Sequence, residues 1–144
     1  IGVIFNLGIF LLGALISGIY PSYHYLFYFI IFLNLFILSF GVSLILSNLF
    51  LLFKDIMQIW SIAVGFGFFL SPILYRGDLF SQKLRFLDYL NPISGIITNS
   101  RNVLMFHTDP DWEMVLFDIG YASLILIIGL ILLNRISPRA SELL

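Results

Sequence analysis

The sequence contains no cysteine and few charged residues. Without cysteine, disulfides and thiolate-bound metals are excluded from these 144 residues. Charged residues make up only 10% and hydrophobic residues 60% of the chain, whereas soluble domains carry about 25% and about 45–50%. A net charge of −1 gives no sign of a nucleic-acid partner, and we expect none. The composition predicts an all-α integral membrane protein.

The residues needed for two kinds of site are also missing. No glycine-rich loop followed by Lys-Ser or Lys-Thr is present to cradle a nucleotide phosphate. No carboxylate pair and no second histidine are spaced to complete a metal or catalytic site around the stretch HTDPDWE. We therefore expect no enzyme activity, no metal and no cofactor in this chain itself.

The first residues form an apolar run that lacks both a methionine and a basic flank. This pattern is not that of a signal peptide. We expect the chain to be a piece of a longer protein, with at least one element upstream.

Uncharged stretches predict four transmembrane helices. A helix needs roughly 20 apolar residues to cross the hydrocarbon core. We expect spans at about 1–20, 25–53, 56–75 and 115–133, with a polar insertion at 76–113 between the last two. The second span would reach roughly 43 Å at ~1.5 Å per residue, so it must tilt or protrude.

Small and polar residues within the spans indicate how the helices pack. Asn34 and Asn48 are expected to hydrogen-bond to neighbouring helices, because an unpaired buried amide is costly. Small residues spaced four apart predict close packing within the chain, with a dimer seam as the alternative. These are Gly13 and Ser17 in the first span, and Ser39, Ser43 and Ser47 in the second.

The third span combines hinge-forming residues with aromatic rings. Pro72 lacks an N–H and crowds the preceding turn, so a kink is expected there, and Gly65 and Gly67 loosen the same half. Two interpretations stay open: the rings face lipid and the interface belt, or they line a path and contact sugar faces. The rings belong to Trp60, Phe66, Phe68, Phe69 and Tyr75.

The insertion predicts a pair of short amphipathic helices, interfacial or re-entrant, between the last two spans. The stronger helix would start at Pro92 with Asn91 as its cap. A weaker one is expected over 78–90. At about 100° per residue, one face of the stronger helix carries Ile93, Ile96, Ile97, Val103 and Leu104, and the other carries Ser94, Thr98, Asn99, Arg101 and Asn102.

Three stretches follow one another along the chain: LLFKDIMQIW, FFLSPILY and LNPISGIITNSRNVLMF. In their order and spacing, the chain resembles the permease subunit of ABC-2 type polysaccharide exporters, which carry O-antigen and teichoic-acid polymers. The matching positions are Ser71-Pro72-Ile73, Leu90-Asn91-Pro92 and Arg101. Lys54-Asp55-Ile56 stands where the family usually has Arg-Asp-Ile. The resemblance covers almost the whole chain.

The resemblance implies that the chain holds spans three to six of six, without the first two spans and the cytoplasmic coupling helix. It implies a multi-pass subunit of the inner or plasma membrane that pairs as a homodimer. A separate ATP-binding cassette ATPase would bind and hydrolyse ATP, and a lipid-linked polysaccharide would be the substrate. Lys54 and Asp55 would lie in a cytoplasmic loop, and Asn91, Pro92 and Arg101 in gate helices on the outer face.

Charge alone favours the opposite orientation. The implied topology puts Lys54, Arg135 and Arg139 inside, but it puts four basic residues of the insertion outside, against the positive-inside tendency. Those four are Arg76, Lys83, Arg85 and Arg101. The resemblance overrides this weak preference.

Three alternatives remain from the sequence. One is an ABC-2 exporter of a drug or lipid, and another is a purely structural membrane subunit. The third is a membrane-embedded enzyme acting on a lipid-linked substrate, with His107, Asp109 and Asp111 as metal ligands. Against the enzyme, Asp109 is expected to cap the last helix, with Pro110 in its first turn and acidic residues near its N-terminus.

Overall fold

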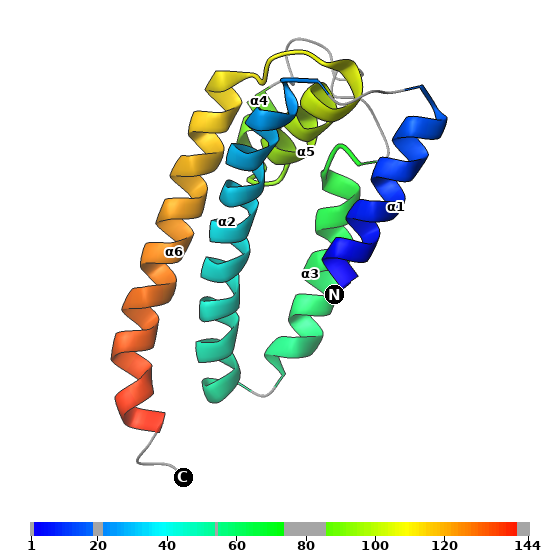
Figure 1. Cartoon of the computed structure of the whole chain (residues 1–144). Coiled ribbons are helices and arrows are strands. Elements are labelled where there is room, and N and C mark those ends of the chain that lie inside the picture. Colours follow the sequence, from blue (N-terminus) through cyan, green and yellow to red (C-terminus); the bar gives the residue numbers. More distant parts are fainter. Residues whose placement is uncertain (1, 19–21, 54, 74–85, 141–144) are drawn as a thin grey trace.

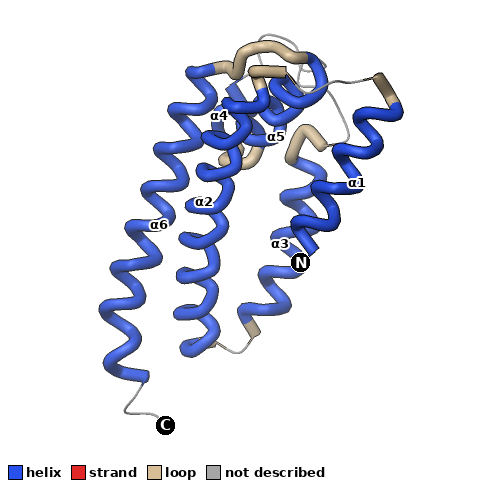
Figure 2. The backbone as a smooth tube through the Cα atoms, in the orientation of Figure 1, coloured by secondary structure: helices blue, strands red, loops and turns tan. Residues whose placement is uncertain are grey.

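A computed structural model describes residues 2–18, 22–53, 55–73 and 86–140 (Figure 1). Within these ranges the chain is helical, with turns and loops between the helices and no strand (Figure 2). The elements are α1 (Gly2–Ile16), α2 (Tyr25–Leu52), α3 (Ile56–Leu70), α4 (Phe86–Leu90), α5 (Ser94–Arg101), the π-helix η3 (Asn102–Phe106) and α6 (Trp112–Ala140).

Two helices, α2 and the Trp112–Ile136 part of α6, are long and apolar enough to cross a membrane. They correspond to the second and fourth predicted spans. Lipid offers no hydrogen-bond partners, so a single segment that crosses it must pair its own backbone N–H and C=O groups, which a helix does. The helices α1 and α3 have 15 residues each, which at ~1.5 Å per residue is about 22 Å, short of a ~30 Å hydrocarbon core. The four-span topology stays a prediction.

The helices α2 and α6 run in parallel, each starting at the end of the molecule that carries α4 and α5 (Figure 1). Near that end the rings of Phe27 and Trp112 meet edge to face, with centroids 5.6 Å apart. Farther along, a Cβ placed on Gly41 would lie 2.8 Å from the Leu126 backbone nitrogen. A Cβ on Gly129 would lie 2.9 Å from the Leu44 Cβ. Glycine on each helix therefore allows the two backbones to approach closely.

The apolar core lies where the insertion packs on these two helices. Its buried members come from four elements: Ile31 and Leu38 from α2, Ile96 from α5, Val103 from η3 and Ala122 from α6. Val103 is 0% exposed and Ala122 is 1% exposed. The α5–η3 segment is thus part of the core, and it does not rest loosely on the surface.

Several predictions of packing within the chain are wrong, while the alternative of a dimer seam stays a prediction. The serine face of α2 is exposed, and Ser43 donates its hydroxyl to the Ser39 carbonyl of its own helix. Asn48 donates to the Leu44 carbonyl at 2.7 Å, again within α2, where a neighbouring helix was expected. The Asn34 side-chain oxygen is buried without a hydrogen-bond partner in the described part of the chain.

The predicted kink at Pro72 is also wrong, because α3 ends at Leu70, before the proline. Ser71 is extended, with φ −88° and ψ 144°. A residue that precedes proline is disfavoured in the helical region, so Ser71 leaves the helix. Gly65 and Gly67 lie within the uninterrupted helix, and a hinge role for these glycines and Pro72 stays a prediction.

Candidate functional site

The end of α3 meets the insertion through a set of polar contacts that we call the joint: Leu70, Ser71 and Pro72 on one side, Asn91 and Arg101 on the other. Ser71 is 3% exposed and Pro72 is also fully buried. The Asn91 amide donates to the Leu70 carbonyl and to the Ser71 hydroxyl, both at 3.2 Å. Ser71 in turn donates its hydroxyl to the Gly67 carbonyl at 2.8 Å.

Arg101 makes the second connection of the joint. Its Nη2 donates to the Pro72 carbonyl at 3.0 Å, from a half-buried position at the end of α5. The last carbonyls of a helix have no partner within the helix. Asn91 and Arg101 supply donors to carbonyls at the end of α3 and just beyond it. Pro72, Asn91 and Arg101, predicted separately as hinge and gate residues, therefore lie together.

Asn91 is held in place by the turn that it starts. Its side-chain oxygen accepts the Ile93 N–H at 3.0 Å, and its carbonyl accepts the Ser94 N–H. The first of these is the bond expected of an N-cap with Pro92 at the first helical position. The regular helix α5 starts only at Ser94, two residues later than predicted.

Asn99 is a central residue that the sequence pattern misassigned to a wet face. It is 0% exposed. Its side-chain oxygen accepts the Asp111 N–H at 2.7 Å, and its amide donates to the Asp111 carbonyl at 3.4 Å. Asn99 thus fixes α5 to the start of α6. The sequence of α5 carries no signal for this role, because polar residues flank Asn99 on both sides, at Thr98 and Ser100.

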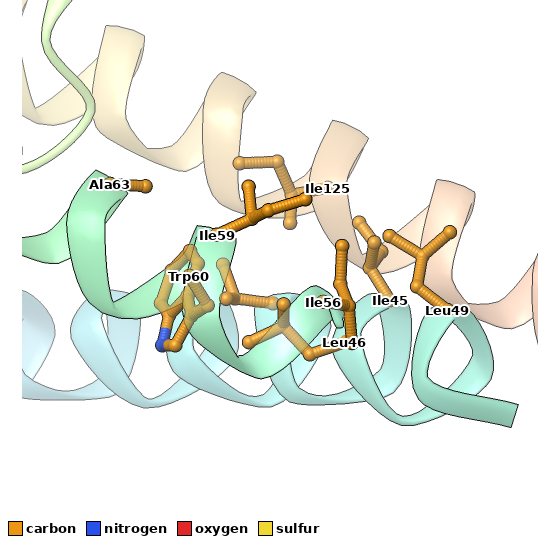
Figure 3. A pocket seen from close by; sticks show the side chains of 9 residues that line it. Ile45, Leu46, Leu49, Ile56, Ile59, Trp60, Ala63 and Ile125 are labelled. Atoms are coloured by element: carbon orange, nitrogen blue, oxygen red, sulfur yellow. The ribbon is translucent and has the colours of Figure 1, made fainter. Parts of the chain in front are cut away.

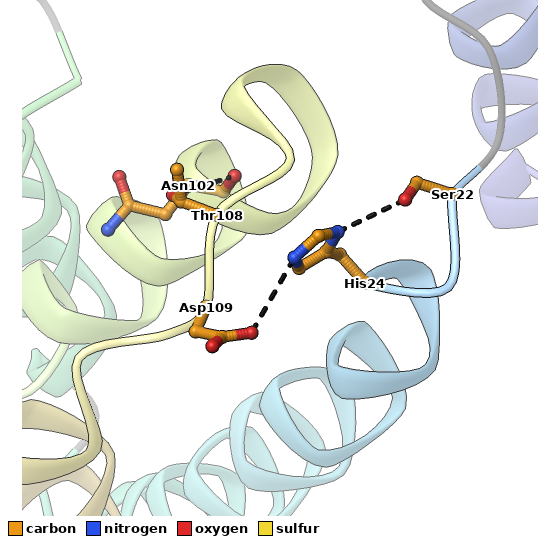
Figure 4. A network of polar contacts seen from close by, with 5 residues as sticks. All are labelled: Ser22, His24, Asn102, Thr108 and Asp109. Atoms are coloured by element: carbon orange, nitrogen blue, oxygen red, sulfur yellow. Dashed lines mark hydrogen bonds and ion pairs between the residues drawn. The ribbon is translucent and has the colours of Figure 1, made fainter.

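Asp111, and not Asp109, caps α6. The Asp111 carboxylate accepts the N–H groups of Glu113 and Met114 at 3.1 and 3.3 Å. Asp109 instead pairs with His24 at the start of α2, with 3.5 Å between Oδ1 and Nε2 (Figure 4). His24 also lies 3.1 Å from the Ser22 hydroxyl through Nδ1.

The three candidate metal ligands point to separate partners. The His107 ring lies edge-on to Tyr25, while Asp109 contacts His24 and Asp111 caps α6. Among the residues that the structure describes, no group of three or more His, Cys, Asp or Glu side chains could hold a metal. The structure therefore does not bring His107, Asp109 and Asp111 together as ligands of one metal.

After α5 the chain continues into the π-helix η3, a wider turn than an α-helix, and leaves it at His107, which is in the left-handed region with φ 53°. Thr108 donates its N–H to the Asn102 carbonyl at 3.1 Å (Figure 4 shows both residues). Tyr25 of α2 donates its hydroxyl to the Leu104 carbonyl at 3.2 Å. Single π turns are frequent at functional sites, and this one is fixed to α2.

A buried carboxylate is also close to α5. Asp118 of α6 is 4% exposed. Its carboxylate occupies the space that a Cβ at Gly95 would need, so a larger residue there would require Asp118 to shift. Beside it, Ser94 donates its hydroxyl to Asp88 at 3.3 Å, and both of these residues are buried.

The aromatic residues of α3 are exposed on this chain. The exposed fraction is 39% for Trp60, 43% for Phe68, 68% for Phe66 and 71% for Phe69. No residue of α3 is buried. Tyr75 and Lys54 lie outside the described residues. Asp55 is exposed at the N-cap position of α3, and its side chain makes no capping bond.

Trp60 differs from the other rings because it lines a cavity of about 310 Å³ between α2, α3 and α6 (Figure 3). All nine residues lining this cavity are apolar: Val42, Ile45, Leu46, Leu49, Ile56, Ile59, Trp60, Ala63 and Ile125. Phe66, Phe68 and Phe69 are not among them, so the structure does not gather the predicted path residues around one pocket of this chain.

No protein-family model matches the chain, and no solved structure shows a significant match. Two curated proteins of Klebsiella pneumoniae do match, each called O-antigen export system permease protein RfbA, at 30% and 29% identity over 109 residues. The match covers 75% of this chain but 41% of each relative's length. These relatives confirm the resemblance seen in the sequence: over three quarters of its length, the chain is similar to O-antigen export permeases.

Proposed function

We propose that this chain is part of the transmembrane permease subunit of an ATP-driven exporter, which moves a lipid-linked polysaccharide of the O-antigen or teichoic-acid type out of the cell. One observation carries the proposal beyond the relatives' name. The residues on which the resemblance rests, Ser71-Pro72, Asn91 and Arg101, stand about 20 to 30 positions apart and meet in one hydrogen-bonded joint.

Each part of the molecule has a place in this proposal. The insertion, with Asn91, Pro92 and Arg101, forms the exit gate on the outer face. The exposed rings of α3 face the polymer path, where flat aromatic surfaces suit sugar rings. An exposed aromatic face also suits a path formed between two copies of the permease, because none of the residues that the structure describes covers it.

The energy source lies on another polypeptide. We propose an ATP-binding cassette ATPase bound at the cytoplasmic side, at the end of the molecule where α2 ends and α3 begins, opposite α4 and α5 (Figure 1). Lys54 and Asp55 stand between these two helices in the sequence. The assembly would hold two permeases and two ATPase subunits in the inner or plasma membrane.

The test is removal of the permease gene from its host, followed by complementation. We expect surface polysaccharide to disappear and lipid-linked polymer to accumulate inside the cell. The intact permease should restore export only with an active ATPase partner. Normal surface polymer together with a changed drug susceptibility or lipid distribution would replace this proposal with the drug or lipid exporter.

Sidedness has its own test, because the positive-inside tendency favours the opposite orientation. The chain has no cysteine, so single cysteines can be labelled without background from this region. An impermeant thiol reagent added to intact cells should label Asp109→Cys, which is 70% exposed in its side chain. Asp55→Cys should react only after the membrane is opened. The reverse pattern would rule out an exit gate.

A further inference from the structure

The insertion differs from a loose lid in how deeply its second half is embedded. Ser94, Asn99 and Val103 are at most 1% exposed. Asn99 bonds to the start of α6, and Tyr25 of α2 bonds to the Leu104 carbonyl. Moving α5 and η3 away from α2 and α6 would break these bonds and open the apolar core, both of which are costly.

In contrast, among the described residues little packs against α3 to fix it in place. None of its residues is buried. Along its side, an apolar cavity of about 310 Å³ separates it in part from α2 and α6. Its polar connections to the insertion, within the described residues, are the Asn91 and Arg101 bonds to Leu70, Ser71 and Pro72.

From this contrast we infer that α3 is the element that moves during gating, while α5 and η3 stay fixed to α2 and α6, and that Asn91 and Arg101 form the latch that α3 leaves and re-engages. This inference rests on the proposed export function. It makes Asn91 and Arg101 positioning residues that act through α3, and it assigns them no contact with the polymer.

The chemistry of the joint suits a contact that opens and closes. All three bonds run from a side chain of the insertion to a carbonyl or hydroxyl at the end of α3 or in the two residues after it, so no ion pair has to be broken. Carbonyls away from water need donors, which favours the engaged state. Ser71 keeps its bond to Gly67 within α3 when the latch opens.

Paired cysteines in the intact permease test which element moves. The joint pair Ser71→Cys/Asn91→Cys replaces side chains whose polar atoms are 3.2 Å apart. The control pair His24→Cys/Asp109→Cys replaces side chains 3.5 Å apart that tie α2 to the loop before α6. Each pair is linked with the same short, reducible bifunctional thiol reagent in cells, and export is measured before linking, after linking and after reduction.

We expect linking of the joint pair to reduce export severalfold and reduction to restore it, while linking of the control pair leaves export unchanged. Unchanged export with a fully linked joint would overturn the inference, because α3 would then not need to leave. Loss of export on linking the control pair would also overturn it, because the insertion would then have to move.

A second measurement keeps the inference separate from the proposed export function. Spin labels at the exposed positions Val64 on α3, Met105 on η3 and Ile131 on α6 report distances in the purified permease in lipid nanodiscs. Arg101→Ala should broaden or shift the Val64–Ile131 distance and leave the Met105–Ile131 distance narrow. Arg135→Ala, an exposed arginine of α6, is the matched control and should change neither.

The two experiments fail in different ways. If the native permease exports no polysaccharide, the proposed function is wrong, and the spin-label distances still decide whether α3 moves. If export is confirmed but Arg101→Ala changes the Met105–Ile131 distance instead, the inference is wrong and the insertion is the moving part.

Discussion

The α2–α6 pair and α3 are both apolar, but they meet the rest of the chain in opposite ways. At the α2–α6 interface, Gly41 and Gly129 lie so close to the facing helix that no Cβ fits without a shift. On α3, Gly65 and Gly67 have open space around them, and no residue is buried. Hydropathy alone would not distinguish α3 from α2 and α6. Yet α2 and α6 pack closely against each other, whereas α3 is largely uncovered.

The difference shows what holds a helix in lipid. Apolar side chains gain little from contact with each other when the surrounding lipid is equally apolar, so close backbone packing and polar contacts decide. The α2–α6 pair uses close packing along its length, and α3 uses hydrogen bonds at one end. A helix held at one end is suited to movement.

The largest effect should come from filling the glycine contact. In Gly41→Leu the new side chain would collide with the backbone of Leu126, because even a Cβ would lie 2.8 Å from its nitrogen. We expect a loss of about 3 kcal/mol or more, the upper end of overpacking costs, seen as a lower thermal midpoint in detergent and less protein in the membrane.

Gly65→Leu on α3 is the matched control for this prediction. Nothing lies within 4 Å of a Cβ at that position, so stability should be retained. Equal losses in the two variants would mean that the α2–α6 contact is not the fixed interface described above.

A smaller effect is expected where the insertion is tied to α6. Asn99→Ala removes both bonds to the Asp111 backbone and leaves the half-buried Asp111 N–H without this acceptor. The expected loss of stability is about 2 kcal/mol, measured by thermal unfolding. Ser100→Ala, at the half-buried neighbouring position, serves as the control, and a comparable loss there would remove Asn99 from its central role.

The two helix starts provide a third contrast. Asp111 caps α6 with two side-chain bonds, whereas Asp55 at the start of α3 makes none. Asp111→Ala should therefore lower stability by about 1 kcal/mol, the usual cost of losing a cap. Asp55→Ala should have little effect on the same thermal midpoint. A larger loss in Asp55→Ala would show that α3 depends on its first turn.

Hydropathy was sufficient to place α2 and most of α6, because long uncharged runs in lipid have few alternatives to a helix. It could not identify which small residues meet another helix. Ser39, Ser43 and Ser47 have the spacing of a packing face but are exposed, while Gly41 makes the contact. Spacing defines a face, and only the partner helix determines whether that face is used.

The candidate site was predictable in part for a similar reason. The end of α3, Asn91 and Arg101 were singled out by the resemblance, but their hydrogen bonds depend on how α3 and α5 meet in space. Asn99 was assigned to a wet face because a polar side chain is usually solvated. Here the backbone of Asp111 satisfies it, and no pattern within α5 indicates a partner 12 residues away.

The smallest effect on stability, and the one most informative about function, should come from the rings. Phe69 on α3 and Phe29 on α2 are almost equally exposed, at 71% and 69%. Substituting either by alanine should change stability by no more than about 0.5 kcal/mol, as is usual for exposed positions.

The same substitutions should differ in their effect on export. If the α3 rings face the polymer, Phe69→Ala should reduce export, whereas Phe69→Tyr, which keeps a flat ring, should export as well as the unaltered permease. Phe29→Ala should leave export unchanged, because a lipid-facing ring has no role in the path. Surface polysaccharide measured at matched protein levels decides the matter: equal export in both alanine variants would mean that the rings of α3 face lipid, as those of α2 are expected to do.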